Sequence, residues 1–104
     1  MATTSKVLFR GAASTSSTTL YTVPTTSTTT VVTNVLVANT AASAATFDLS
    51  IDGVQIANDV VVAANDTLSI DLKQVIPANA TPKTITGLAS AITVNFHISG
   101  VEIV

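Results

Sequence analysis

The stretch Thr46-Phe47-Asp48-Leu49-Ser50-Ile51-Asp52 decides the fold class of this chain. Large apolar side chains stand at every second position, and polar side chains stand between them. That spacing places the apolar groups on one face of a β-strand, because successive side chains of a strand point to opposite faces. Residues 67–73 and 92–99 repeat the pattern. No segment has the periodicity of an amphipathic helix, so the chain is predicted to be all-β.

Turn signals divide the chain into about seven or eight short strands. Asp52-Gly53 is typical of a two-residue type I′ hairpin turn, and Asn, Asp and Pro residues predict turns at 64–66 and 77–79. This spacing indicates a single antiparallel β-sandwich of Ig-like or jelly-roll type. We expect residues 6–104 to form the sandwich and residues 1–5 to form a flexible N-terminal arm. The predicted strands cover residues 5–13, 19–23, 29–39, 45–52, 54–63 (interrupted near 58–59), 67–75, 83–90 and 92–103.

Two segments lead to sharper predictions. Residues 30–38 are apolar on both strand faces, which predicts a central strand that is covered on both sides. At Gly100 the alternation changes phase, because Val101 and Ile103 have the opposite parity to Ile98. A β-bulge at Gly100 is predicted to return these two side chains to the inward face. The three phenylalanines are predicted to lie in the core.

The composition favours one domain with an unusually neutral surface. The 104 residues suit a single domain, and only 10% of them are charged, against about 25% in ordinary soluble domains. Copies of such a surface repel one another weakly, which favours association; the alternative is a Thr-rich monomer, thermostable or secreted. The net charge of −2 and only four cations provide no basic surface for nucleic-acid binding. No membrane span and no signal peptide are predicted.

The sequence offers little catalytic chemistry. His97 is the single histidine, and it falls on the polar face of a strand with no nucleophile motif beside it. The acidic residues fall on outward faces or in turns, where general acid–base catalysis has no enclosed pair to use. Residues 58–59 and 65–66 could offer oxygen ligands to calcium, but their spacing matches no calcium loop and turn formation explains them. We therefore predict no enzyme, no catalytic or metal-binding residues and no cofactor.

Several stretches together resemble small virion proteins of tailed bacteriophages, including head decoration (cement) proteins. In order, they cover nearly the whole chain beyond residue 19. The stretches are Leu20-Tyr21-Thr22-Val23-Pro24, residues 30–39, Ala45-Thr46-Phe47, residues 63–67 and the ending Phe96-His97-Ile98-Ser99-Gly100-Val101-Glu102-Ile103.

The resemblance implies a β-sandwich that assembles on the virion as a homo-oligomer, often a trimer. The expected partners are copies of the chain itself and the major capsid protein, with synthesis in the host cytoplasm and no role for nucleic acid or membrane. Similar modules occur in tail, baseplate and fibre-associated proteins, which is one alternative. The absence of an added fibre or receptor-binding domain favours decoration. A receptor- or carbohydrate-binding module is the other alternative.

Three residues are the candidates for partner contact. Lys6 and Arg10 lie close to the expected N-terminal arm, where they could anchor the protein to an acidic capsid surface. Tyr21 either packs its ring at an edge of the sandwich or presents it to a partner. It is also the only aromatic candidate for a carbohydrate site.

Overall fold

The computed structural model describes residues 2–104, which form eight β-strands and no helix. The all-β prediction is confirmed, and each predicted strand lies within two residues of the observed bounds. Met1, part of the expected arm, lies outside the described residues. The strands are β1 (Thr3–Ala12), β2 (Thr18–Thr22), β3 (Thr29–Asn39), β4 (Ala45–Ile51), β5 (Val54–Val62), β6 (Asp66–Ile76), β7 (Thr84–Ala89) and β8 (Val94–Ile103).

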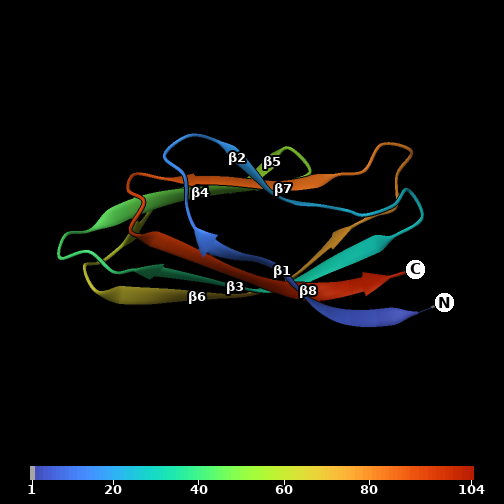
Figure 1. The fold of residues 1–104 in the computed structure, drawn as a ribbon, viewed down its shortest axis with the longest axis horizontal. Helices are drawn as coiled ribbons and strands as arrows, with labels where there is room; N and C mark the ends of the chain where they lie inside the picture. Colours follow the sequence, from blue (N-terminus) through green and yellow to red (C-terminus); the bar gives the residue numbers. More distant parts are fainter. Residues whose placement is uncertain (1) are drawn as a thin grey trace.

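The strands form two antiparallel sheets packed face to face (Figure 1). Sheet A has the order β1-β8-β3-β6, and sheet B has the order β2-β7-β4-β5. The chain reverses direction at the β4–β5 turn, so that its two halves pair as one long antiparallel ribbon. The ribbon is wrapped around a core, and its pairs are β1·β8, β2·β7, β3·β6 and β4·β5. This is the connectivity of an eight-stranded jelly roll, so the topology decides between the two predicted sandwich types.

The core lies between the two sheets and follows the predicted alternation. In β4 every second residue from Ala45 to Ile51 is buried, and β8 shows the same pattern from Val94. Phe47 of sheet B meets Phe96 of sheet A edge to face, with ring centroids 5.9 Å apart and an angle of 71° between the rings. This geometry is the favourable one for an aromatic pair. The two rings are fully buried, whereas Phe9 is partly buried against the core.

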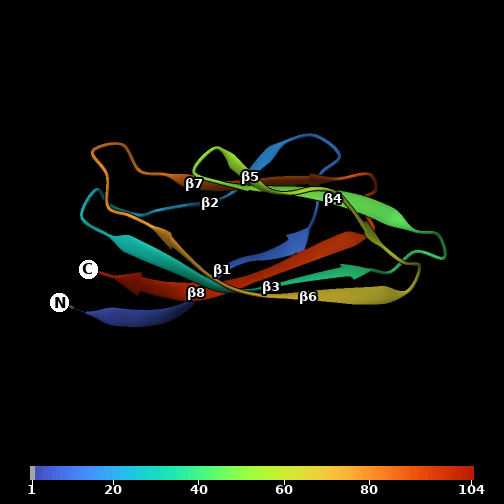
Figure 2. The ribbon, with the colours of Figure 1, turned by 180° about the vertical axis from the view of Figure 1, so that it is seen from behind.

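The central strand of sheet A differs in part from its prediction. β3 does lie centrally, between β8 and β6, but it is not covered on both sides. Its inner residues, such as Val35 and Val37, are buried, whereas Val31 and Leu36 on the outer face are only half-buried. The reason is that the molecule has two layers, so no third layer packs on the outer face of sheet A (Figure 2).

The bulge predicted at Gly100 is also wrong in its position. The extra residues are Leu8 in β1 and Thr33 in β3, and β8 passes between them without one. The alternation of inward and outward positions in β8 therefore continues unbroken: Gly100 takes an inward position, and Val101 stays on the outer face. A side chain at residue 100 would collide with the Val31 carbonyl and would lie 2.8 Å from Leu8 Cδ1. Glycine is needed because these neighbours close over its backbone.

Turns are found at residues 52–53 and 64–65, as predicted, whereas residues 77–79 lie in an irregular loop with no regular turn. Asp52 and Gly53 both have positive φ angles, 55° and 74°, as a type I′ hairpin turn requires. The interruption predicted near residues 58–59 is a β-bulge at which Asp59 has a φ of 50°. The Asp59 amide donates to Asp48 Oδ1 over 2.7 Å, which satisfies an N–H that the ladder leaves free.

The start of the chain differs from the flexible arm expected at residues 1–5. Thr3, Thr4 and Ser5 already pair with the end of β8. The backbones of Ala2 and Val104 exchange two hydrogen bonds, of 3.1 and 2.9 Å. The two chain ends therefore lie side by side at one end of a long molecule of 46 × 22 × 18 Å (Figure 1).

Candidate interaction surface

The outer face of sheet A carries aliphatic side chains on all four of its strands. Because opposed residues of paired strands share a face, the register aligns Ser5, Val101, Val31 and Val75 in one row across the four strands. Val75 is 59% exposed, and Val7 in the next row is 45% exposed. Aliphatic groups thus reach the solvent at both edges of this sheet.

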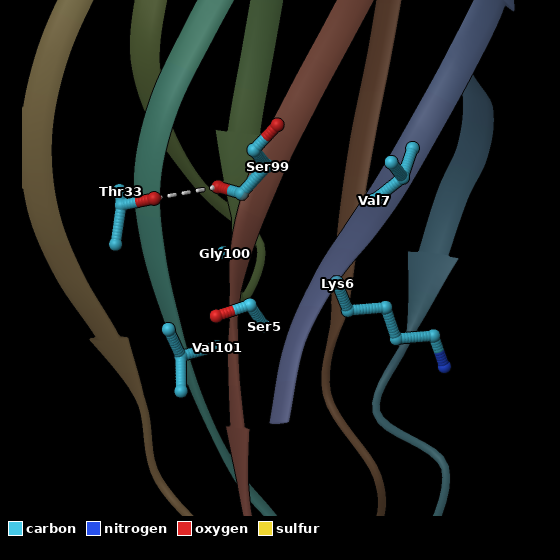
Figure 3. A pocket seen from close by; sticks show the side chains of 7 residues that line it. All are labelled: Ser5, Lys6, Val7, Thr33, Ser99, Gly100 and Val101. Atoms are coloured by element: carbon cyan, nitrogen blue, oxygen red, sulfur yellow. Dashed lines mark hydrogen bonds between the residues drawn. The ribbon is translucent and has the colours of Figure 1, made fainter. Parts of the chain in front are cut away.

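The two bulges hollow this face. Extra residues in β1 and β3 strengthen the local bend of the strands, and a shallow hollow of about 390 Å³ lies at this level (Figure 3). Thr33 closes one side, and its hydroxyl donates to the Ser99 carbonyl over 3.2 Å. A neighbouring hollow of about 480 Å³ shares Thr33 and continues to Asp71 and Lys73. The lining of the first is Ser5, Lys6, Val7, Thr33, Ser99, Gly100 and Val101.

A polar cluster occupies the opposite, inward side of the same strands near the chain ends. The Tyr21 hydroxyl donates to Glu102 Oε2 over 2.6 Å and lies 2.8 Å from Thr30 Oγ1. Lys6 Nζ lies 3.3 Å from each carboxylate oxygen of Glu102. Burial, and next the hydrogen bond to Glu102, raise the pKa of Tyr21 to about 12. The cluster therefore ties β2 of sheet B to β1, β3 and β8 of sheet A.

The three candidate contact residues do not converge on one site. Tyr21 is buried, with 8% of its surface exposed, so its ring packs at the sandwich edge and is not presented to a partner. The Lys6 side chain is partly exposed, but its ammonium group is ion-paired with Glu102. Arg10 is exposed on the outer face of sheet A, opposite His97. The hydroxyl of Tyr21 and the charge of Lys6 are thus used within the domain, whereas Arg10 faces solvent.

Glu102 is the important residue that the sequence reasoning missed. The assumed bulge at Gly100 turned Glu102 outward, whereas unbroken alternation from Phe96 and Ile98 places it inward. Strict alternation along β8 therefore predicts an inward Glu102. The prediction failed because a bulge was assigned to β8, whereas the bulges belong to the two neighbouring strands.

No cluster of metal-ligating side chains is found in the part of the chain that the structure describes. Among residues 2–104 no three His, Cys, Asp or Glu side chains are placed to share a metal ion. His97 has Arg10 as its cross-strand neighbour in β1 and Leu36 in β3. Neither is the carboxylate that orients a catalytic imidazole. Residues 2–104 also contain no helix long and apolar enough to cross a membrane.

Comparison with solved structures finds this fold in virus particles. A chain in the structure of infectious bursal disease virus, Gx strain, superimposes with a TM-score of 0.58 and 16% identity over 97% of the present chain. A chain in the crystal structure of the T13 particle of the same virus gives a TM-score of 0.57 and 13% identity, also over 97%. The likeness shows the fold.

The jelly roll corresponds to only part of those viral chains. The present chain spans 30% of the length of each one. No protein-family model matches the sequence, and no curated protein matches it either.

Proposed function

We propose that this protein is a structural component of a virion, and specifically a head decoration protein of a tailed bacteriophage that binds the capsid surface as a homotrimer. The observation that carries the proposal is the jelly roll, which superimposes over 97% of its length on chains of a virus particle. The virion resemblance of the sequence, which is independent of that superposition, points in the same direction.

The surface suits adhesion to protein. With 10% charged residues, shape and apolar contact dominate over long-range repulsion. Sheet A offers two unpaired edges and half-exposed valines, groups that a protein neighbour can cover. A decoration protein of this kind bridges neighbouring capsid subunits and resists the internal pressure of packaged DNA. Lys6 is ion-paired with Glu102, whereas Arg10 is exposed and is therefore the stronger candidate for binding an acidic group on a protein neighbour.

The carbohydrate-binding alternative loses its candidate residue. Sugar sites commonly need an exposed aromatic face, and Tyr21 was the one proposed. Tyr21 is buried and its hydroxyl is bonded inside the domain. No described aromatic side chain is fully exposed, since Phe47 and Phe96 lie in the core and Phe9 is partly buried.

The test is binding to capsids that lack the protein. Purified protein is added to such capsids, its mass is measured in solution by light scattering, and bound copies are located by cryo-electron microscopy. We expect trimers that saturate regular sites on the head and raise the temperature at which the capsids rupture. Density on the tail or baseplate would establish the tail-protein alternative, and failure to bind any part of the particle would refute a virion role.

A further inference from the structure

We propose that the two free edges of sheet A bind each other between copies: β1 of one molecule pairs with β6 of the next in an antiparallel arrangement. The inference deepens the proposed function, because it assigns the surface that builds the proposed homotrimer. Both strands are at the ends of the strand order in sheet A, so each has one side of its backbone unpaired in the described chain. An unpaired edge is a template for adding a strand.

Sheet A has the edges that can pair, and sheet B does not. β1 and β6 contain 10 and 11 residues. In sheet B, the edge strand β2 contains only five residues and its register breaks between Thr19 and Tyr21. The other edge, β5, has two register breaks and a residue of positive φ, Asp59. Short edges and edges with several irregularities resist strand addition, whereas β1 and β6 are long and each has a single register break against its neighbour.

The strand directions are compatible with a continuous sheet. β1 is antiparallel to β8, β8 is antiparallel to β3, and β3 is antiparallel to β6. β1 and β6 therefore run in opposite directions. Two copies placed edge to edge with their A sheets facing the same way bring β1 and β6 together as an antiparallel pair.

The two edges also carry one complementary pair of charges on the outer face. There β1 holds the cation Arg10, whereas β6 holds Asp71 together with one cation, Lys73; Lys6 and Asp66 have inward parity and do not contribute. Asp71 accepts one bond from Asn34 Nδ2, of 3.1 Å. A carboxylate has further acceptor positions, so Asp71 can also receive the Arg10 guanidinium of a neighbour. Opposite charges directly across two strands stabilise the pair.

One alignment of β1 with β6 of the neighbouring copy places outer-face residues of the two strands opposite each other. With Arg10 opposite Asp71 of the neighbour, Ala12 lies opposite Ser69. The extra residue Leu8 then brings Val7 opposite Lys73, and Ser5 opposite Val75. All four of these pairs place outer-face residues together. The register of each strand with its own neighbour shows this for seven of the eight residues, and alternation between Asp71 and Val75 places Lys73 on the same face. The exposed Val7 becomes covered by the aliphatic part of Lys73.

Such an interface is heterologous, because β1 of each copy meets β6 of the next. Heterologous contacts close into a ring when a whole number of equal rotations from copy to copy completes a full turn. Otherwise they extend into a fibre. In the proposed trimer the same contact is made three times, and no edge of sheet A remains free. This closure explains how long, exposed edges are protected from uncontrolled association.

A charge swap tests the pairing. We expect Arg10→Asp and Asp71→Arg each to weaken trimer formation at least about 10-fold, an effect of about 1.4 kcal/mol. Combining Arg10→Asp and Asp71→Arg in one chain should restore it. Lys83→Asp is the matched control, since Lys83 pairs with Asp52 and belongs to neither strand. Trimers that persist in both single variants, or a double variant that remains dissociated, would overturn the inference.

Disulfide trapping gives an independent readout, because the chain has no cysteine. An Ala12→Cys chain mixed with a Ser69→Cys chain should form crosslinked heterodimers under mild oxidation, since opposed antiparallel residues have the Cα separation of a disulfide, about 4.4–6.8 Å. Neither variant alone should crosslink. Self-crosslinking of one variant, or no crosslink in a mixture that still forms trimers, contradicts the pairing. Capsid binding, measured separately on the same proteins, decides the proposed function.

Discussion

Tyr21 links the two sheets through its hydroxyl group, and its titration follows from that position. Its pKa is raised to about 12 from the ordinary 10.0, chiefly by burial and next by the bond to Glu102. A raised folded-state pKa means that the neutral phenol stabilises the fold fully below pH 10, and that this stabilisation is lost as the pH rises through 12. The sequence contains no other tyrosine, so tyrosinate absorbance reports this group alone.

The Tyr21→Phe variant tests this linkage. At neutral pH we expect a loss of about 1–2 kcal/mol in the free energy of unfolding, because Glu102 and Thr30 lose a buried hydrogen-bond partner. Between pH 10 and 12 the difference between the two proteins should shrink, since only the wild type has a phenol to ionise. Urea unfolding at a series of pH values measures both effects. A stability difference that is constant across this pH range would argue against the linkage.

Gly100 is a residue whose missing side chain makes room for its neighbours. Gly100→Ala places a Cβ against the Val31 carbonyl and 2.8 Å from Leu8 Cδ1, so we expect a loss of about 3 kcal/mol from overpacking. Gly11→Ala is the matched control in the same sheet, because its Cβ would lie 3.4 Å from the nearest atom, Phe9 Cζ. The control should be neutral or slightly stabilising in thermal unfolding. Equal losses in both variants would refute the close-approach argument.

At the scale of elements, the bulge of β5 depends on one side chain of its neighbour. Asp48 Oδ1 accepts the Asp59 amide over 2.7 Å. Asp48→Ala should cost about 1 kcal/mol and should speed hydrogen exchange at the Asp59 amide. Asp48→Asn keeps an acceptor oxygen and should leave both quantities nearly unchanged. If the Ala and Asn variants exchange at the same rate, the side chain does not hold the bulge.

The strands were predictable from the sequence, and the bulges were not. Alternation is a local property, so segments such as residues 29–39 and 45–51 were found almost to the residue. A bulge is a relation between two strands. Leu8 and Thr33 are extra only with respect to β8, and nothing in their own sequence neighbourhood shows this. The misassigned bulge at Gly100 followed from reading one strand alone.

The candidate surface was less predictable for the same reason. Lys6 and Tyr21 were named as separate contact residues, but they share one partner, Glu102, which lies 96 and 81 positions away in the chain. Pairing across such a distance depends on the order of the strands in the sheet. The topology, and with it the two open edges of sheet A, became visible only in three dimensions.

At the scale of the whole molecule, the jelly roll makes two sheets into one cooperative unit. Each sheet contains strands from both halves of the chain, so we expect the two sheets to fold and unfold together. The Phe47–Phe96 contact joins the sheets at their centre. A domain of this kind has a total stability of about 5–15 kcal/mol, and most of its apolar burial lies in this single layer.

The Phe47→Ala variant tests this cooperativity. We expect a loss of about 3–5 kcal/mol from the cavity and the missing edge-to-face contact, with a single unfolding transition retained in urea. Because the core is shared, amide exchange should accelerate by the same factor in β3 and β8 of sheet A as in β4 and β7 of sheet B. Phe47→Leu, which keeps much of the volume, should cost less and preserve this equality. Protection lost in sheet B but kept in sheet A would show instead that the sheets unfold separately, and that the wrapped topology does not couple them.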